Sequence, residues 1–366
     1  MASNETQLGS CDALSTRGSV VDYMQVINTT TNGFNESLLE LCRSNICNSL
    51  WGFGNSDISG IGMIVGYLFE TILGFGLAFC IAVLGTTTSN KYKKVLIESY
   101  RTFFNCAVFF AFSIQIACVI VLVRRDFSIT ANGLGAFTTQ ITWTIALLSM
   151  LPLICAIVSL DKVDTKKSGY RFFLFCGCWL MFFYTFISHM IGDFSPSQIQ
   201  KGSISTPTSV ESPAAYSKEW EILENMCLGV VDQLTGQEQN IMSGFGAAGS
   251  IVVIGYGLAK LLWLIVSGLH SDSGEKFKNK CSRFTPGKRW DVHLTLGAYF
   301  VLFYLTIPQF WAVFRLRDIQ KALSERTNNA YTDDQWNFGQ VVAVMIFAPV
   351  FTEVGLYLIS GNIDSH

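Results

Sequence analysis

The sequence predicts an all-α, polytopic membrane protein, a bundle of seven transmembrane helices. Half of its 366 residues are hydrophobic and only 14% are charged, and the mean hydropathy is +0.38. These values lie outside the usual range of soluble domains. Seven stretches hold the ~20 apolar residues that a helix needs to cross a bilayer. They lack the polar/apolar alternation of barrel strands, so helices are the economical way to satisfy the backbone in lipid.

The chain begins with a polar arm, residues 1–56, which has no apolar core of the kind that a cleavable signal peptide needs. The first transmembrane helix is therefore expected to direct insertion. Residues 57–361 form the bundle, and residues 362–366 form a short tail. The expected spans are 58–84, 100–123, 134–160, 170–191, 244–269, 292–314 and 338–359.

Prolines lie inside three of these spans. Pro152, Pro308 and Pro349 belong to the third, sixth and seventh. Each removes a backbone donor and clashes with the preceding turn, so each should disturb its helix; Pro349 should free the carbonyl of Met345. Kinked helices open internal cavities, which freed carbonyls can line.

Loop charges predict the orientation, because cytosolic loops carry an excess of Lys and Arg. Three alternate loops are basic, which places them in the cytosol, the N-terminus in the lumen and the C-terminus in the cytosol. Their residues are Lys91, Lys93 and Lys94; Lys162, Lys166, Lys167 and Arg171; and Lys276, Lys278, Lys280, Arg283, Lys288 and Arg289.

Two features of the lumenal side agree with this orientation. The arm carries glycosylation sequons at Asn4, Asn28 and Asn35, which are usable only in the lumen. Disulfides also persist there. Four cysteines fall on this side, either paired in an order that the sequence does not reveal or free: Cys11, Cys42, Cys47 and Cys227.

The longest connection, residues 193–242, is expected in the lumen. Its first part is rich in Ser, Pro and Thr, and its second part has the apolar spacing of a helix. Plain packing on the bundle and a lid both fit that pattern.

Three ionisable side chains lie at membrane depth, where such groups are rare and usually face the bundle interior: Glu70, Lys260 and Glu353. Lys260 and Glu353 lie at similar depth, so an ion pair between them is one interpretation and a functional site is the other. Glu70 lies near the centre of the first span with no cation assigned to it. Burial favours its protonated form, which is suited to donate a proton; a hydrogen bond between helices is the structural alternative.

Aromatic residues accompany these groups at helical spacing. Tyr67 shares a helix face with Glu70, where Gly66 and Gly74 leave room for a ligand or another helix. Aromatic faces stabilise cations, although core packing is their commoner use. The residues expected to shape a ligand site are Trp143, Tyr256, Trp263, Tyr304 and Tyr357, with Gln140 and Gln309 as further polar edges.

Composition and motifs argue against several classes of protein. A net charge of -2 provides no basic face for nucleic acid. No Asp-rich diphosphate motif faces a cavity, because the adjacent Asp333 and Asp334 fall in a lumenal loop, and no H-x-x-H or C-x-x-C cluster occurs. No metal or other cofactor is therefore expected. A short echo, WGFG at 51–54 and WNFG at 336–339, precedes the first and opens the last span.

Two segments carry a family resemblance: NSDISGIGMIVGYLFETILGF (55–75) and WNFGQVVAVMIFAPVFTEVGLYL (336–358). They resemble a group of filamentous-fungal integral membrane proteins in which an N-x-D-I-x-G-I-G start and a W-x-F-G-Q-x-x-A end recur. Some members with this pattern are the membrane-bound terpene cyclases of ascofuranone- and ascochlorin-type biosynthesis. The resemblance implies a prenylated aromatic substrate with a terminal epoxide, which is protonated rather than ionised from a diphosphate.

The resulting hypothesis is a metal-independent, redox-neutral terpene cyclase of the endoplasmic-reticulum membrane, acting in fungal meroterpenoid biosynthesis. Glu70 would protonate the epoxide and Tyr67 would hold the acid. Glu353, with or without Lys260, would receive a proton or stabilise positive charge. Its partners would be a hydrophobic terpenoid substrate, membrane lipid, and an upstream prenyltransferase and epoxidase. The alternative is a seven-helix receptor or a small-molecule or proton-coupled transporter, in which Lys260 and Glu353 form a switchable pair.

Overall fold

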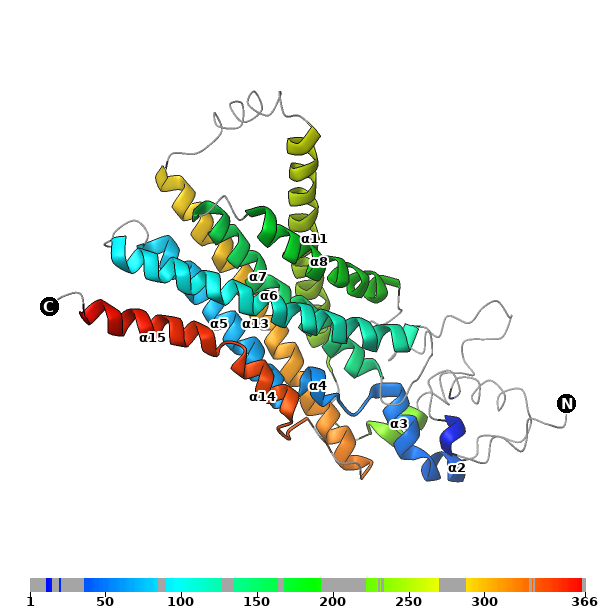
Figure 1. Ribbon diagram of the computed structural model, residues 1–366. Helices are drawn as coiled ribbons and strands as arrows, with labels where there is room; N and C mark the ends of the chain where they lie inside the picture. Colours follow the sequence, from blue (N-terminus) through cyan, green and yellow to red (C-terminus); the bar gives the residue numbers. More distant parts are fainter. Residues whose placement is uncertain are drawn as a thin grey trace.

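The computed structural model confirms an all-α bundle (Figure 1). It describes residues 11–14, 20, 36–84, 90–126, 135–163, 168–191, 222–229, 231, 234–269, 288–328, 331 and 333–363. In these ranges every regular element is helical, and seven helical segments are long and apolar enough to cross a membrane. The three sequons, at Asn4, Asn28 and Asn35, and the first part of the long loop lie outside the described residues.

Six long helices and one broken helix form the spans. The order is α5 Ile61–Leu84, α6 Asn90–Asp126, α7 Ala136–Val163, α8 Ser168–Ile191, α11 Gly236–Leu269, α13 Lys288–Arg326, and the pair α14 Phe338–Met345 and α15 Ala348–Ile363. Short helices precede them: η1 Cys11–Leu14, α2 Glu36–Leu41, α3 Arg43–Trp51 and α4 Ser56–Ser59.

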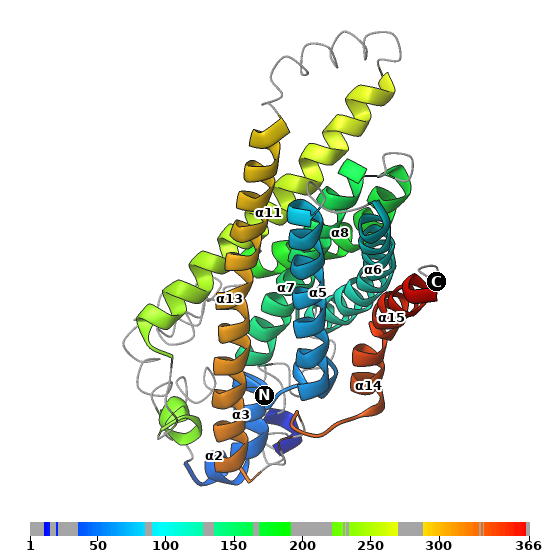
Figure 2. The same cartoon turned by 90° about the vertical axis from the view of Figure 1, so that its left-hand side faces the viewer.

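Helix α7 is the centre of the bundle. Of its most apolar stretch 94% is buried, against at most 50% for any other span. Helices α5, α6, α8, α11 and α13 surround it, each packed against α7 and against its neighbour in the ring. Figures 1 and 2 show α14 and α15 outside this ring, beside α5 and α6. The hydroxyl groups of Thr142, Thr144 and Ser159 donate to carbonyls one turn back, which satisfies them inside the core.

Two helices are much longer than their apolar stretches. Helix α6 begins at Asn90, ten residues before the expected span, and α13 continues to Arg326, twelve residues beyond it. The added turns of α13 bury Leu316, Ile319 and Leu323 at helical spacing. Hydropathy detects only the part of a helix that lies in lipid, so it missed these amphipathic extensions.

Pro349 breaks the seventh span, as its missing N–H and its ring predict. Helix α14 ends at Met345, Ile346 and Phe347 form a turn, and α15 starts at Ala348. The turn redirects the chain, because α14 packs on α5 and α15 packs on α6. By contrast, α7 and α13 run through Pro152 and Pro308 as single helices.

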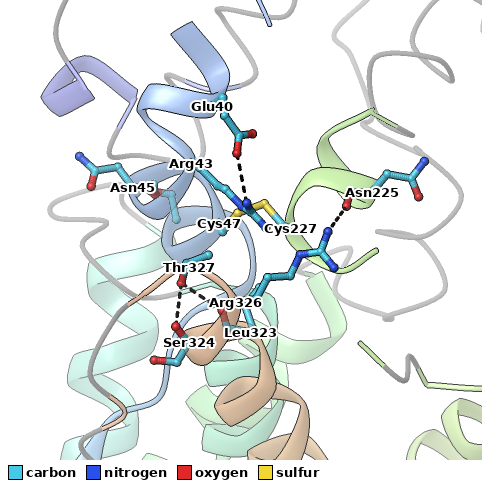
Figure 3. Close-up of a disulfide and its surroundings, with 11 residues drawn as sticks. Glu40, Arg43, Asn45, Cys47, Asn225, Cys227, Leu323, Ser324, Arg326 and Thr327 are labelled. Atoms are coloured by element: carbon cyan, nitrogen blue, oxygen red, sulfur yellow. Dashed lines mark hydrogen bonds and ion pairs between the residues drawn. A yellow bond between two sulfur atoms is a disulfide. The ribbon is translucent and has the colours of Figure 1, made fainter. Parts of the chain in front are cut away.

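Two disulfides mark one end of the bundle, called here the disulfide end. Cys11 is bonded to Cys42, and Cys47 is bonded to Cys227. Figure 3 shows the second bond joining α3 to the segment 222–229, whose helical turn confirms the expected periodicity. Arg326 at the end of α13 donates to the Asn225 carbonyl at 3.1 Å. The second half of the long connection is therefore anchored to both α3 and α13.

A hydrogen-bonded cluster at the same end joins the start of α5 to the start of α14, and we call it the clasp. Gln340 Oε1 accepts from the Gly62 N–H at 2.9 Å, and its Nε2 donates to the Ser56 carbonyl at 3.1 Å. Asp333 accepts from the Ser59 hydroxyl, and its carbonyl accepts from the Ile61 N–H at 2.9 Å. The clasp residues are Asn55, Ser56, Ser59, Ile61, Gly62, Asp333, Asn337 and Gln340.

The WGFG and WNFG segments are not structural equivalents. Trp51 is buried in α3 at 2% exposure, whereas Trp336 is 55% exposed. Gly52 and Gly54 have φ values of 80° and 106°, which glycine adopts most readily. A Cβ at Gly54 would also lie 2.8 Å from Asp333 Oδ2. The first segment is thus a tight turn beside the clasp, so the echo does not reflect an internal repeat.

Candidate functional site

Glu70 lies in the middle of the bundle on α5, and its side chain is 1% exposed. One turn to either side of it, Gly66 and Gly74 contact Phe110 and Phe103 of α6. Glu70 therefore projects toward α6. Its Oε1 atom is buried and has no hydrogen-bond partner in the part of the chain that the structure describes. A buried carboxyl group without a partner is costly, which is typical of functional groups at membrane depth.

Aromatic rings from α5, α6 and the turn between α14 and α15 gather at the α5 face that carries Gly66 and Gly74. The Phe110 ring centroid lies 5.5 Å from Tyr67 and 5.4 Å from Phe347, and Phe103 lies 6.1 Å from Phe347 and 5.7 Å from Tyr100. All five rings are buried. We call Tyr67, Tyr100, Phe103, Phe110 and Phe347 the aromatic cluster. Its position is fixed by the glycines of α5 and by the turn that Pro349 imposes.

Tyr67 belongs to this cluster through its ring rather than through its hydroxyl group. The hydroxyl donates to the Ile58 carbonyl at 3.2 Å, and Tyr100 donates in the same way to the Gly74 carbonyl at 3.2 Å. A phenol has one proton to donate. The sequence hypothesis had Tyr67 holding the Glu70 acid, but in the structure the Tyr67 hydroxyl donates to the Ile58 carbonyl instead.

The expected ion pair between Lys260 and Glu353 is wrong. Lys260 Nζ lies 2.6 Å from Asp161 Oδ2, and Arg171 Nη1 lies 3.8 Å from Asp161 Oδ1. Helix α11, which carries Lys260, packs against α7, α8 and α13, whereas α15 packs against α6. Asp161, at the end of α7, was missed because it lies in a stretch interpreted as a loop boundary. Arg171 was counted as a loop charge but is 3% exposed.

Glu353 itself is half-buried on α15. Among the described residues it has no hydrogen bond or ion pair, so its expected role stays a prediction. Lys260 is accounted for by its carboxylate partner.

The predicted substrate-binding aromatics do not gather around Glu70. Trp143 is buried and stacks on His189, with centroids 4.0 Å apart, and Tyr256 contacts Phe175 edge-on at 5.6 Å. Tyr304 is 60% exposed and pairs with Phe245. These contacts lie on α7, α8, α11 and α13. The side chains of Trp263 and Tyr357 lie outside the described residues, although their helices are described.

Sequence reasoning missed Phe103, Phe110 and Phe347, which form the aromatic cluster packed against the glycines on either side of Glu70. The available signal was the spacing of Phe103 and Phe110, two helical turns apart on α6, matched to Gly66 and Gly74 on α5. With 29 Phe residues in the chain, that spacing was not distinctive.

The arrangement combines a carboxyl group with aromatic faces in a region without water-exposed surface. An acid there can protonate a neutral oxygen, and ring quadrupoles can stabilise a cation formed next to it. Within the described ranges no three His, Cys, Asp or Glu side chains gather as a metal site would require. Comparisons of the chain with protein-family models, curated proteins and solved structures give no match.

Proposed function

We propose that this protein is a membrane-bound cyclase that protonates a terminal epoxide on a terpenoid chain attached to an aromatic group. The observation that carries the proposal is Glu70, a buried carboxyl with an unpartnered oxygen, one turn from the glycines of α5 that pack against the aromatic cluster. An apolar substrate would reach such a site from the bilayer. The resemblance of residues 55–75 and 336–358 to fungal membrane proteins that include epoxide-opening cyclases supports the same reaction class.

The reaction is an isomerisation in which atoms and electrons balance. The Glu70 carboxylic acid donates its proton to the epoxide oxygen as the bond to the more substituted carbon breaks. An alkene of the chain attacks that carbon, and the positive charge moves along the closing rings. The last cation loses a proton, which returns to the Glu70 carboxylate. Faces of Phe103, Phe110 and Phe347 stabilise the passing charge. Glu353 is the second candidate acceptor for that proton.

Location and orientation belong to the same proposal. An endoplasmic-reticulum membrane with the disulfide end in the lumen fits the two disulfides, because oxidising compartments maintain such bonds. The substrate would require an aromatic prenylation and an epoxidation beforehand, so enzymes of those two classes are the expected pathway neighbours.

The test is expression in a heterologous fungus, with microsomes given an epoxyfarnesyl-substituted phenol. Chromatography with mass spectrometry should show a product of unchanged mass and new retention. Glu70→Gln keeps the shape of the side chain but removes the acid, so turnover should fall by about 10²–10⁴-fold. Glu325→Gln, an exposed change near the end of α13, should leave turnover unaltered. Glu353→Gln tests the second acceptor in the same assay.

Normal turnover by a well-inserted Glu70→Gln protein would remove Glu70 from the mechanism. Well-inserted wild-type protein that leaves the epoxide intact would exclude this substrate class. Ligand-dependent signalling or flux at the cell surface would instead favour a receptor or a carrier.

A further inference from the structure

A second set of buried polar groups lies at the level of Glu70 but on other faces of the helices. Thr71, Gln115 and Gln309 are 4%, 0% and 1% exposed. Thr71 Oγ1, Gln115 Oε1 and Gln309 Nε2 are buried, and each lacks a hydrogen-bond partner within the described residues. Buried polar atoms are rarely left unpaired. Three such atoms from three helices therefore require an explanation that packing does not provide.

Contacts with α7 place these three side chains at the height of Ser149. Gln115 Nε2 donates to Ser149 Oγ at 3.2 Å and to the Ala146 carbonyl at 2.7 Å. Helix α5 runs parallel to α7, and its Gly74 contacts Pro152 of α7. Thr71 lies three residues before Gly74 and Ser149 lies three residues before Pro152, so Thr71 and Ser149 are at the same height.

The antiparallel helix α13 is placed by two hydrogen bonds to α7. Tyr299 bonds to Ser159 at 2.6 Å, and Gln320 bonds to Thr138 at 3.1 Å. Starting from the bonded pair Tyr299 and Ser159, Gln309 lies ten residues further along α13 and Ser149 lies ten residues back along α7. Because the two helices are antiparallel, Gln309 is therefore at the height of Ser149. Helical spacing also puts Gln309 on the same face of α13 as Gln320, eleven residues further on. We call Thr71, Gln115, Ser149 and Gln309 the central polar layer.

The unpartnered atoms define the chemistry of a ligand. Gln309 Nε2 can only donate, Gln115 Oε1 can only accept, and the Thr71 hydroxyl can do either. No cationic side chain belongs to the layer, so a buried anionic ligand group would be left without a counter-charge and is disfavoured. A neutral hydroxyl group, which accepts one hydrogen bond and donates another, meets both amides.

We propose that the central polar layer binds a phenolic hydroxyl on the aromatic head of the substrate. Gln309 Nε2 donates to the phenol oxygen, the phenol donates to Gln115 Oε1, and the Thr71 hydroxyl completes the oxygen's coordination. This assignment rests on the proposed cyclase for the identity of the ligand. It explains why the layer adjoins Glu70: a head group held between α5, α6 and α13 keeps its apolar chain next to the acid and the aromatic cluster.

Binding can be tested without turnover by using unreactive probes. Farnesylphenol, which lacks the epoxide, and its O-methyl ether are titrated into purified protein in nanodiscs, with tryptophan fluorescence as the readout. The ether cannot donate to Gln115, so wild-type protein should bind the phenol about tenfold more tightly, as expected for one buried neutral hydrogen bond. Gln115→Leu should abolish that preference while leaving ether binding within about twofold of wild type. Gln309→Leu removes a donor to the oxygen that both probes share, so it should weaken the binding of both and leave the preference in place.

Two further variants keep the test decisive. Thr71→Val, which preserves the side-chain shape, removes one donor to the ligand oxygen and should weaken the binding of both probes, a result that does not depend on either leucine variant folding. Gln237→Leu, an exposed change in the first turn of α11, should retain the full preference.

Equal binding of phenol and ether by wild-type protein would overturn the proposal, because water would then account for the layer. So would a preference that survives in Gln115→Leu, or no binding of either probe. The two proposals can be refuted separately. A phenol preference without conversion of the epoxide would refute only the cyclase activity, and conversion without the preference would refute only the binding of the phenol by the central polar layer.

Discussion

Replacing Gln340 with alanine should loosen the clasp and lower the stability of the whole bundle. Gln340 is fully buried, and its amide makes two hydrogen bonds that join α14 to the start of α5. The Gly62 N–H belongs to the first turn of α5, where backbone donors have no intrahelical partner. In the alanine variant this N–H and the Ser56 carbonyl would both be left inside the protein unpaired.

The magnitude follows from those two groups. Leaving a buried donor or acceptor unsatisfied costs about 1–3 kcal/mol each, and relaxation around the small alanine should keep the sum near the low end, about 2–4 kcal/mol. An unfolding entropy of about 2.1 cal/mol/K per residue converts this into a Tm decrease of about 3–5 °C for a chain of this length.

The assay is thermal denaturation in detergent, followed by the fraction of protein that remains monodisperse. Gln237→Ala provides the matched control, because it is the same Gln-to-Ala substitution at an exposed position. A Gln340→Ala Tm within 1 °C of the control would refute the reasoning, since the two hydrogen bonds would then contribute nothing measurable to the attachment of α14.

Two further changes test the packing of α11 and the charge in the clasp. A Cβ at Gly246 would lie 2.0 Å from Trp143, whereas a Cβ at Gly244 would meet nothing within 4 Å. Gly246→Ala should therefore lose about 1–3 kcal/mol and Gly244→Ala gain about 0.5–1 kcal/mol in thermal unfolding; equal shifts would contradict the packing. Burial raises the pKa of the Asp333 carboxyl, against the opposing hydrogen bond from Ser59. A folded-state pKa above the unfolded value of about 3.9 contributes stability that is fully present below that value and is lost as pH rises through the folded pKa. The Tm of wild type should therefore fall relative to that of Asp333→Asn from about pH 4 upward. Parallel pH profiles of the two Tm values would contradict this prediction.

The number and order of the spans were predictable because burial in lipid requires long apolar helices, and seven such runs are evident in the sequence. The ends of α6 and α13 were not, since their outer turns follow amphipathic spacing rather than hydropathy. Nor was the central position of α7 predictable. Its apolar content resembles that of its neighbours, and its burial depends on which helices pack around it.

Site residues divided in the same way. Glu70 was found because a carboxylate within an apolar run is conspicuous on its own. The partner of Lys260 was not found, because two residues at similar depth can belong to helices on opposite sides of a bundle, as those of α11 and α15 do here. Phe103 and Phe110 lie on α6, far in the chain from Phe347, and only the turn before Pro349 brings the Phe347 ring against theirs.

The clasp changes what the family resemblance means. In N-x-D-I-x-G-I-G, Asn55 caps α4 and the Gly62 N–H donates to Gln340, the glutamine of W-x-F-G-Q. The Gln340 side chain also donates to the Ser56 carbonyl, so the two motifs join α4–α5 to α14. Gly60 and Gly62 leave room for the Gln340 side chain, since a Cβ at either would lie within 2.5 Å of it. Such residues are explained by assembly of the bundle at its disulfide end. A chain sharing this pattern would thus be expected to share the fold, whereas the proposed cyclase activity would also require a carboxyl group at the position of Glu70.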